Sequence, residues 1–305
     1  MTRVLLLGKD GQIGWELQRV LAPHFLVFPC GRREVDLSHP SDIKSVVDEA
    51  RPDLIINAAA YTAVDRAEHD TEAAYSVNTV APEVLATAAK SRGALLVHYS
   101  SDYVFDGQKS GLYVENDVAE PLGVYGKSKR LGEMAVEASG CDFLILRTSW
   151  VFGARGRNFL LTMLRLANSM PELRVVHDQV GVPNWSRMIA QISLACLLAL
   201  HERPRKLLGT YHLSAGGPVT WHGFAESIVS LGSAIGLCPN VPVVPISTAD
   251  FPIPTRRPVN SALSNVRLQD AFGLEVPDWR ACLRWCMEDL AAATATASQT
   301  KRTWT

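Results

Sequence analysis

Short apolar segments alternate with helix-length segments through the first half of the chain, and this rhythm limits the fold more than any other feature. The strand candidates are RVLLLG, HFLVFP, DLIINAA, LLVHYSS and DFLILRTS, and the helix candidates between them are QIGWELQRVLA, PSDIKSVVDEA, TEAAYSVNTVAPEVLATAAKSRG and SKRLGEMAVEASG. The strand candidates are continuously apolar, as strands covered on both faces of a sheet should be. Alternating strands and helices favour right-handed βαβ units. The pattern therefore predicts an α/β fold with a Rossmann-type, doubly wound parallel sheet.

Three glycines, Gly8, Gly11 and Gly14, stand between the first strand candidate and the first helix candidate. Glycines at such a place allow a tight turn, a close approach of the backbone to a pyrophosphate, and close packing of helix on strand. A tight turn without a ligand would need the same glycines, but a strand before and a helix after favour dinucleotide binding. The spacing G-x-x-G-x-x-G resembles that of the extended short-chain dehydrogenases/reductases.

The stretch after the second strand candidate bears on the choice of dinucleotide. An acidic residue there would bond the ribose hydroxyls of NADH, whereas a cation would accept the 2′-phosphate of NADPH. Gly31 stands about where the acid is expected, and Arg32 and Arg33 follow it. Two guanidinium groups suit a phosphate dianion, so the sequence favours NADPH; NADH, with a merely solvated basic turn, is the alternative. Asp36, followed by Leu37, is expected to face the adenine amine, as in related extended reductases.

A serine, a tyrosine and a lysine are expected to meet at the carboxyl end of the sheet, where ligands bind in open α/β folds. Ser101 follows the fourth strand candidate, and Tyr125 and Lys129 lie on the next helix. Residues four apart share a helix face, so the ammonium can lie near the phenol and is expected to lower the pKa of Tyr125. Ser101 would hold a carbonyl oxygen. Together the three residues predict acid catalysis of ketone reduction.

The rhythm of the chain changes after about residue 150. Prolines gather between 239 and 258. We expect residues 1–150 to form a dinucleotide-binding domain, to which later segments return, and residues 151–293 to form mainly a smaller mixed α/β substrate-binding lobe. Residues 294–305 lack a core pattern and are expected to fray. The helix candidates of the second half are 184–201, 221–235 and 279–293.

Composition and charge exclude several other classes of protein. Apolar residues make up 47% and charged residues 20% of the 305 residues, and the formal net charge is −1, so no basic field invites nucleic acid. The longest apolar runs fall well short of the roughly 18 residues that span a bilayer, so no membrane segment is expected. The cysteines form no C-x-x-C pairs, which favours reduced, buried thiols in a cytoplasmic chain. They are Cys30, Cys141, Cys196, Cys238, Cys282 and Cys286.

Nine stretches, in order along nearly the whole chain, resemble the dTDP-4-dehydrorhamnose reductases. They are GKDGQIGWELQ, RPDLIINAAAYTAVDRAE, HYSSDYVFDG, GVYGKSKRLGE, LRTSWVFG, NFLLTMLRLA, DQVGVPN, GTYHLSAGG and RPVNSAL. The resemblance implies that NADPH reduces the C4 ketone of dTDP-6-deoxy-L-lyxo-4-hexulose (dTDP-4-dehydro-L-rhamnose) to give dTDP-L-rhamnose, in nucleotide-sugar and cell-surface polysaccharide biosynthesis. A dTDP-linked 4-keto-6-deoxysugar is therefore the expected substrate.

The resemblance also assigns catalytic and cofactor residues by position. It implies a catalytic triad of Ser101, Tyr125 and Lys129, the first being serine where some members have threonine. The cofactor residues that it implies are Gly8, Gly11, Gln12, Ile13, Gly14, Asn57, Ala58, Ala59, Ala60 and Asn78, together with Tyr125 and Lys129.

Three residues are implied for the substrate. Tyr103 and Trp150 match positions that line the sugar pocket, where an aromatic face suits a deoxysugar ring and its methyl group. Trp150 could instead be a buried packing residue. Arg257 matches the nucleotide end of the pocket, where a guanidinium can hold two oxygens of a diphosphate.

One departure from the family concerns a metal ion. Some members are described as dimers bridged by Mg²⁺ through several glutamates, and Glu16 matches one of these. Arg187 and Met188 stand where another carboxylate would lie, whereas a hard cation needs several oxygen ligands. No metal is therefore expected, and the residues leave a homodimer as an open possibility.

Two rival functions remain at this point. A reductase of another nucleotide-linked 4-keto-6-deoxysugar would have the same fold and triad and would differ only in pocket contacts. A non-catalytic regulatory subunit resembling the β subunit of methionine adenosyltransferase would also share the fold and a nucleotide site. The intact triad favours catalysis.

Overall fold

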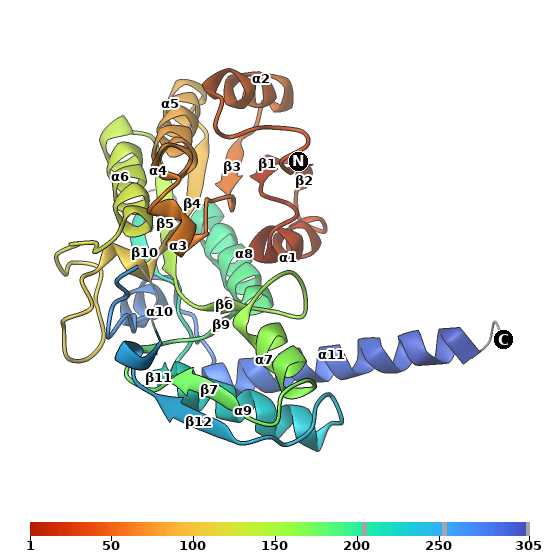
Figure 1. Ribbon diagram of the computed structural model, residues 1–305. Helices are drawn as coiled ribbons and strands as arrows, with labels where there is room; N and C mark the ends of the chain where they lie inside the picture. The colour runs from red at the N-terminus through yellow and green to blue at the C-terminus, as the bar shows by residue number, and fades with distance from the viewer. Residues whose placement is uncertain (203–205, 252–254, 303–305) are drawn as a thin grey trace.

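A sheet of six parallel strands forms the centre of the computed structural model, which describes residues 1–202, 206–251 and 255–302 (Figure 1). The strand order is β10-β5-β4-β3-β1-β2. The strands are β1 (Arg3–Leu7), β2 (Leu26–Cys30), β3 (Leu54–Asn57), β4 (Leu95–Ser101), β5 (Phe143–Thr148) and β10 (Gly209–His212). The predicted doubly wound parallel sheet is confirmed, and each of the five strand candidates of the first half contributes a strand to it.

The direction in which strands are added reverses between β1 and β3. From β1 the chain adds β2 on one side and then β3, β4 and β5 on the other. In open α/β sheets the ligand crevice lies outside the carboxyl ends of the strands at such a point. The glycine loop after β1 and residues 58–60 after β3 flank this point, so the fold brings two of the predicted cofactor segments together.

Helices cover both faces of the sheet (Figure 1). One face carries α2 (Pro40–Ala50), α5 (Ala81–Arg92) and α6 (Val124–Ser139), and the other carries α1 (Gln12–Leu21) and α8 (Ser186–Glu202). Successive side chains of β1 alternate between the two layers: Leu5 and Leu7 pack beside α2 and α5, whereas Val4 and Leu6 pack beside α1. Burial on both faces explains why these strands lack a polar alternation.

The helix candidate over 71–93 is interrupted in the structure. A π-helical turn, η1 (Ser76–Val80), separates α4 (Thr71–Tyr75) from α5, and the short helix α3 (Val64–Ala67) precedes them. Such turns are rare and are frequently found at functional sites. Asn78 lies within the turn and is buried.

A smaller part with mixed structure lies below the sheet in Figure 1. It contains three two-stranded pairings, β7 with β12, β8 with β11, and β6 with β9. The remaining elements are η2 (Asp102–Val104), β6 (Val151–Phe152), α7 (Phe159–Ala167), β7 (Leu173–Val176), β8 (Val180–Gly181), β9 (Asn184–Trp185), β11 (Val219–Thr220), α9 (Trp221–Ala234), β12 (Val243–Ile246), η3 (Thr248–Asp250), α10 (Val266–Phe272) and α11 (Trp279–Arg302).

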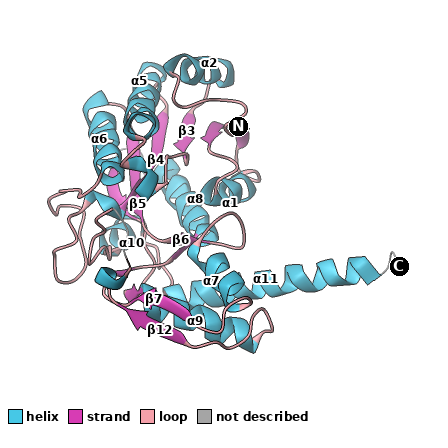
Figure 2. Cartoon of the chain, in the orientation of Figure 1, coloured by secondary structure: helices cyan, strands magenta, loops and turns pink. Residues whose placement is uncertain are grey.

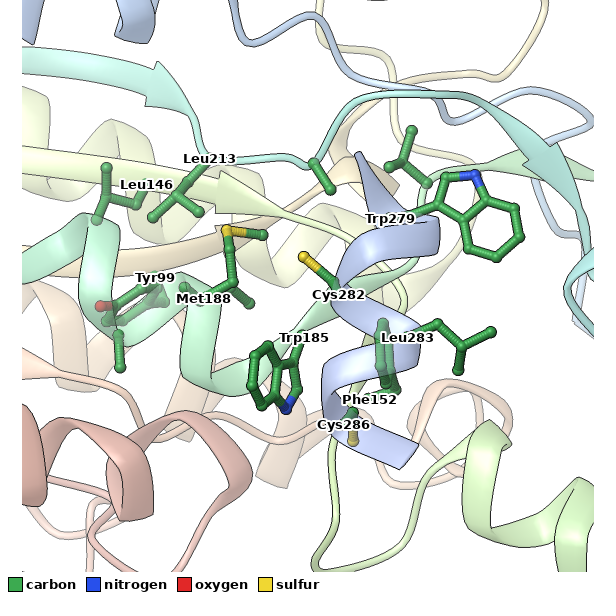
Figure 3. Packing of buried hydrophobic residues seen from close by; sticks show 14 of the residues in the cluster. Tyr99, Leu146, Phe152, Trp185, Met188, Leu213, Trp279, Cys282, Leu283 and Cys286 are labelled. Carbon is green, nitrogen blue, oxygen red and sulfur yellow. The ribbon is translucent and has the colours of Figure 1, made fainter. Parts of the chain in front are cut away.

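One apolar cluster joins the sheet to this smaller part. Tyr99 of β4 and Leu146 of β5 belong to the same cluster as Met188 of α8 and Cys282 and Leu283 of α11 (Figure 3). Strand β10 also returns to the sheet from the second half of the chain and pairs with β5. The two parts are therefore held together by shared packing.

Helix α11 continues into the segment that the sequence predicts to fray. It runs to Arg302 and projects away from the rest of the molecule (Figures 1 and 2). The stretch after residue 290 is rich in alanine, the best helix former, so helical structure does not need a core pattern there. Residues 303–305 lie outside the described part of the chain.

Two expectations from composition can be compared with the structure. All six cysteines are free and buried, as expected. In the described ranges, no helix combines the length and apolar content needed to cross a bilayer.

Candidate active site

The glycine loop closes the first turn of the fold so tightly that two of its positions exclude any side chain. Gly8 has a φ of +88°, and a Cβ there would lie 2.8 Å from the carbonyl carbon of Ala58. A Cβ on Gly14 would lie 2.0 Å from the carbonyl oxygen of Gly8. A Cβ atom essentially never comes within 3.0 Å of such an atom, so only glycine fits. The loop thereby packs directly against the chain that leaves β3.

The amino end of α1 is open to an anion. Gly11 occupies the N-cap position, where no side chain accepts a hydrogen bond from the helix. The first backbone N–H groups of a helix have no partner within the helix, and they carry the positive end of its dipole. Gln12 and Ile13 supply such groups here. The loop with Gly8, Gly11 and Gly14, called the glycine cradle below, therefore leaves room for a ligand beside the free N–H donors of the helix. A dinucleotide pyrophosphate binds at this place in this class of fold.

The Gln12 side chain itself turns toward the smaller part of the molecule. Its amide oxygen accepts a hydrogen bond from Asn158 Nδ2 at 2.9 Å, and its Nε2 lies 3.3 Å from the carbonyl oxygen of Val151. The backbone of Gln12 remains available to a pyrophosphate, whereas its side chain ties the cradle to the loop after β6.

The basic pair after β2 is exposed. Arg32 and Arg33 form no ion pair within the described residues, so both guanidinium groups are available to a phosphate. Asp36 is only partly available, because Oδ1 accepts hydrogen bonds from the backbone N–H and the hydroxyl of Ser38 at 2.9 and 2.7 Å. These hydrogen bonds lower the pKa of Asp36. Leu37 beside it is buried.

Two asparagines that are predicted to border the nicotinamide end of the cofactor form hydrogen bonds within the protein through their side-chain amides. Asn78 exchanges hydrogen bonds with the backbone of Tyr61 at 2.9 and 3.0 Å and donates to the hydroxyl of Ser128. Asn57 accepts from the backbone N–H of Ala59 and contacts His98. Both residues are fully buried. The side-chain amides of both residues are therefore occupied by contacts within the protein, and the place of residues 57–60 and 78 at the nicotinamide stays a prediction.

Ser101 and Tyr125 come together as the sequence predicts. The Ser101 hydroxyl forms a hydrogen bond that lowers the pKa of Tyr125. Burial raises that pKa more strongly, and the charge of Asp102 adds to the increase, so the pKa of Tyr125 stands at about 12. The prediction that Lys129 lowers it was wrong, because burial of the half-buried phenol outweighs every favourable contact. The phenol is held firmly in its protonated form.

Lys129 is directed away from the phenol, toward β4. Its Nζ donates to the carbonyl oxygen of Tyr99 at 2.6 Å and lies 3.3 Å from Nε2 of His98. The side chain is buried. Burial lowers the pKa of Lys129 to about 8, although the charge of Glu133 acts in the opposite direction. The ammonium is therefore less stable here than in water.

Asp102 extends the polar end of β4. Its Oδ1 accepts a hydrogen bond from the Ser101 hydroxyl at 3.0 Å, and its Oδ2 has no partner although it is buried. Burial raises the pKa of Asp102 to about 6, in spite of the nearby hydroxyl groups of Ser261 and Ser101, which lower it. A buried carboxylate oxygen without a partner marks a place where a ligand hydroxyl could donate.

Tyr103 lies near Tyr125, and Arg257 lies near Tyr103. The Tyr103 ring packs edge-to-face on Tyr125 with 5.5 Å between centroids, and the charge of Arg257 acts on its phenol. Arg257 is held by Asp65, with Nη2 3.0 Å from a carboxylate oxygen. Its buried Nε has no hydrogen-bond partner. One donor of this guanidinium is thus left over for a ligand.

Trp150 is stacked against a second tryptophan. The centroids of the Trp150 and Trp221 rings lie 3.5 Å apart, and the angle between the ring planes is 7°. Phe159 packs on Trp221, with 4.6 Å between ring centroids. The backbone of Trp150 has a φ of +43°, which is uncommon for a bulky residue. A Cβ on Gly181 would lie 2.4 Å from the Trp150 indole. Trp150 is therefore a packing residue with one face covered, in line with the packing alternative, and its place in a sugar pocket stays a prediction.

Comparison with known proteins agrees with this architecture. A family model described as the RmlD substrate binding domain matches residues 1–292. The chain belongs to this family. A curated dTDP-4-dehydrorhamnose reductase of Burkholderia thailandensis is 49% identical over 294 residues, which cover 94% of this chain and 99% of that protein.

Solved structures of relatives superpose closely on this RmlD-family chain. The dTDP-4-dehydrorhamnose reductase of Clostridium acetobutylicum has a TM-score of 0.87 at 36% identity, over 94% of this chain and 99% of that one. That of Bacillus anthracis, solved in complex with NADP, has a TM-score of 0.86 at 34% identity, over 94% of this chain and 99% of that one. The family and the fold are both established by these matches.

An arginine occupies the place where some family members are described as having a metal-binding carboxylate. Arg187 lies between α1 and α11, with Nε 3.3 Å from Glu16 and Nη1 2.6 Å from Asp289. The guanidinium thus links both carboxylates within one chain. Across the described ranges, no group of three or more His, Cys, Asp or Glu side chains is arranged to hold a metal ion.

Several residues of this RmlD-family site were not predicted from the sequence. His98 contacts Asn57 and Lys129, and Trp221 stacks on Trp150. Glu133 acts on Lys129 through its charge. A signal existed for His98, because it interrupts an otherwise apolar strand candidate two residues before the polar end of β4. Glu133 follows Lys129 by one helical turn and so had to face the sheet as well. Trp221 carried no such signal.

Proposed function

We propose that this chain reduces the C4 ketone of dTDP-6-deoxy-L-lyxo-4-hexulose (dTDP-4-dehydro-L-rhamnose), with NADPH, to give dTDP-L-rhamnose for cell-surface polysaccharide biosynthesis. The observation that carries the proposal is the meeting of Ser101 and Tyr125 at the carboxyl edge of the parallel sheet, the edge at which the glycine loop also follows its strand. Membership of the family and relatives named for this activity support the choice of substrate.

The cradle residues hold the dinucleotide in this proposal. Backbone N–H groups at Gln12 and Ile13 bind the pyrophosphate, since the amino end of α1 lacks a side-chain cap. The exposed Arg32, with Arg33 behind it, binds the 2′-phosphate, which favours NADPH over NADH. Asp36 and Leu37 border the adenine, and residues 57–60 and 78 form the wall at the nicotinamide end.

Tyr125 is the general acid of the proposed reaction. NADPH, when bound, supplies the hydride that adds to the C4 carbonyl carbon. The Tyr125 hydroxyl gives its proton to the carbonyl oxygen as that oxygen gains charge. The Ser101 hydroxyl, which donates to Asp102 Oδ1 in the free protein, rotates to donate to the same carbonyl oxygen. Because the pKa of Tyr125 is raised to about 12, the phenol carries its proton at neutral pH. A reductase needs the acid in this form.

In the same proposal, Tyr103, Trp150 and Arg257 bind the sugar and the nucleotide. Tyr103 packs on Tyr125 and so lies beside the reacting carbon. Trp150 contributes the uncovered part of its indole to the sugar, in place of the full aromatic face expected at first. Arg257 offers its remaining donor to the diphosphate, while Asp65 fixes its orientation.

Two further parts of the proposal concern the cellular compartment and the oligomeric state. Six free, buried thiols fit a reducing compartment, and we place the enzyme in the cytoplasm. We further propose a homodimer, in line with the resemblance. Light scattering on the purified chain measures its mass directly, and a monomer at assay concentrations would contradict the second part.

A cofactor-oxidation assay tests the main proposal. The enzymatically prepared keto sugar is supplied with NADPH or NADH, absorbance of the reduced nicotinamide is followed, and the sugar product is identified by NMR. We expect faster turnover with NADPH and dTDP-L-rhamnose as the product. A product with the other C4 configuration, or turnover only of a different 4-keto-6-deoxysugar, would replace the substrate assignment. No oxidation with any keto sugar would overturn the enzyme assignment.

A further inference from the structure

Glu68, which directly follows α3, forms a hydrogen bond with the first residue of the helix that carries Tyr125. Its Oε1 accepts from the backbone N–H of Val124 at 2.8 Å, although the two residues are 56 positions apart in the sequence. The Glu68 residue is partly buried. Because Val124 immediately precedes Tyr125, this contact lies next to the proposed general acid.

The amino end of α6 has no cap of its own. Gly123 occupies the N-cap position without a side chain, and the first turn contains no acidic residue. The first N–H groups of a helix lack partners within the helix and carry the positive end of its dipole. A carboxylate from another element satisfies one of these donors and brings negative charge to that end. Glu68 therefore does for α6 what a local N-cap residue does for other helices.

The first turn of α6 lies in direct contact with two other elements. A Cβ on Gly123 would lie 2.6 Å from Oε1 of Glu68, after α3. A Cβ on Gly126 would lie 2.2 Å from the carbonyl oxygen of Tyr103, in η2. Glycine at both positions allows this close approach, so the place of the turn depends on what the neighbouring elements hold against it.

Helix α3 also contacts the arginine that is proposed to bind the nucleotide. Asp65 accepts a hydrogen bond from Nη2 of Arg257 at 3.0 Å, and Glu68 follows on the same short segment. This segment continues the chain from residues 57–60, which are predicted to border the nicotinamide. One stretch after β3 thus connects the proposed binding residues with the start of α6.

We propose that Glu68 is a positioning residue, which caps α6 through the N–H of Val124 and thereby holds the Tyr125 hydroxyl where the substrate carbonyl oxygen is protonated. The inference rests on the proposed function. A general acid must lie within hydrogen-bond reach of the atom that it protonates, and a displacement of about 1 Å can cost about 10²-fold in rate. Glu68 acts through Tyr125, so its loss lowers kcat more than it changes binding.

Amide hydrogen exchange tests the cap without any turnover. We would transfer the full-length chain, without ligand, into D₂O and follow by mass spectrometry a peptide that covers the first turn of α6. Exchange should become faster there in Glu68→Ala, because the N–H of Val124 loses its acceptor. Glu68→Gln keeps an oxygen acceptor and should exchange much like the wild type. Unchanged exchange in Glu68→Ala would overturn the proposal.

Steady-state kinetics test the positioning of Tyr125. Glu68→Ala should lower kcat about 10- to 100-fold, with the Kd for NADPH and the KM for the keto sugar nearly unchanged. Glu68→Gln should restore most of the kcat. A normal kcat in Glu68→Ala, or a loss that falls on KM and Kd instead, would show that Glu68 does not position the acid.

Asp278 offers the matched control for the loss of a helix cap. It precedes α11, and its Oδ1 accepts from the backbone N–H of Arg280 at 2.8 Å. Asp278→Ala should lower the melting temperature about as much as Glu68→Ala, yet leave kcat and the exchange of α6 unchanged. An equal loss of kcat in both variants would mean that general destabilisation explains the effect, and the positioning role would be wrong.

A change at Asp65 separates the role of Glu68 from the folding of α3. Asp65→Ala should raise KM, because Arg257 loses its anchor, and should change kcat little. A fall in kcat as large as that in Glu68→Ala would assign the effect to α3 as a whole and contradict the proposal.

A double variant tests whether Glu68 acts through Tyr125. Added to Tyr125→Phe, Glu68→Ala should lower the remaining kcat little further, since residues that act through one another are not additive. Full additivity would overturn the proposal. If the wild-type chain reduces no keto sugar, the proposed function is wrong, and the exchange measurement then decides by itself whether Glu68 caps α6.

Discussion

Two hydrogen bonds join Arg147 to Glu133 in the interior of the protein. Nε and Nη2 of the guanidinium lie 2.7 and 2.8 Å from the two carboxylate oxygens. The Glu133 side chain is fully buried and that of Arg147 is 4% exposed. Because Glu133 belongs to α6 and Arg147 to β5, the pair holds the helix that carries Tyr125 and Lys129 against the sheet.

Breaking this pair should cost much stability. Glu133→Gln leaves an uncompensated guanidinium in the interior, which typically costs about 3–5 kcal/mol. Urea unfolding followed by circular dichroism gives the free energy of unfolding. Glu137→Gln is the matched control, because Glu137 also pairs with an arginine, Arg130, but is 35% exposed, and surface pairs are worth about 0–1 kcal/mol. Equal losses in the two variants would show that burial of the pair does not matter.

The same pair predicts a loss of stability in acid. Burial alone would raise the pKa of Glu133, but the hydrogen bonds and charge of Arg147 bring it below its ordinary value of 4.5. A carboxyl group whose pKa is lower in the folded than in the unfolded state stabilises the protein at pH values above its unfolded-state pKa. This stabilisation is lost as the pH falls through the folded-state pKa. The difference in unfolding free energy between wild type and Glu133→Gln should therefore be largest above pH 5 and shrink below pH 4. A difference that stays constant with pH would contradict this.

The glycine cradle predicts a contrast between two neighbouring positions. A Cβ on Gly14 would meet the carbonyl oxygen of Gly8 at 2.0 Å, whereas a Cβ on Gly11 would approach the same atom only to 3.3 Å. Gly14→Ala should therefore open the loop and weaken NADPH binding about tenfold or more, which corresponds to about 1.4 kcal/mol. Gly11→Ala should change the Kd much less. Fluorescence titration with NADPH measures both, and similar losses would disprove the steric argument.

Much of the fold could be predicted from local sequence, because β1, β3 and most of β4 and β5 are apolar runs, and helix-length segments separate the strands of the first half. The order of Gly8, Ser101 and Tyr125 along such a pattern sufficed to predict the edge of the sheet at which they lie, since the carboxyl ends of parallel strands share one edge.

What could not be predicted depends on burial and on contacts across elements. The pKa of Tyr125 was predicted in the wrong direction because spacing on a helix says nothing about desolvation, which is the largest effect on that phenol. The direction of Lys129 depends on a carbonyl oxygen of β4. The partner of Trp150 is a residue of α9, and no local pattern brings these two together.

Removing the phenol hydroxyl tests the acid assignment. Tyr125→Phe should lower kcat by about 10²–10⁴-fold, the usual contribution of a general acid, with little change in the Kd for NADPH. Stopped-flow measurement of NADPH oxidation under saturating sugar gives kcat. Tyr103→Phe is the matched control, because its ring packs on Tyr125 yet it is assigned to binding, so its effect should fall mainly on KM. A normal kcat in Tyr125→Phe would show that another group gives the proton.

The stack of Trp150 on Trp221 can be tested without removing either ring. Two indoles 3.5 Å apart and nearly parallel should couple and give a paired signal in the circular dichroism spectrum. Gly181→Ala should abolish that signal, because the new methyl would lie 2.4 Å from the Trp150 indole and must displace it. Since Trp150 borders the proposed sugar site, KM for the keto sugar should rise in the same variant. Trp285→Phe is the control, because that ring lies 6.4 Å from its neighbour Trp185 and is tilted. If the paired signal survives Gly181→Ala but is lost in Trp285→Phe, the coupled pair is Trp185 and Trp285, and the prediction for Trp150 and Trp221 is wrong.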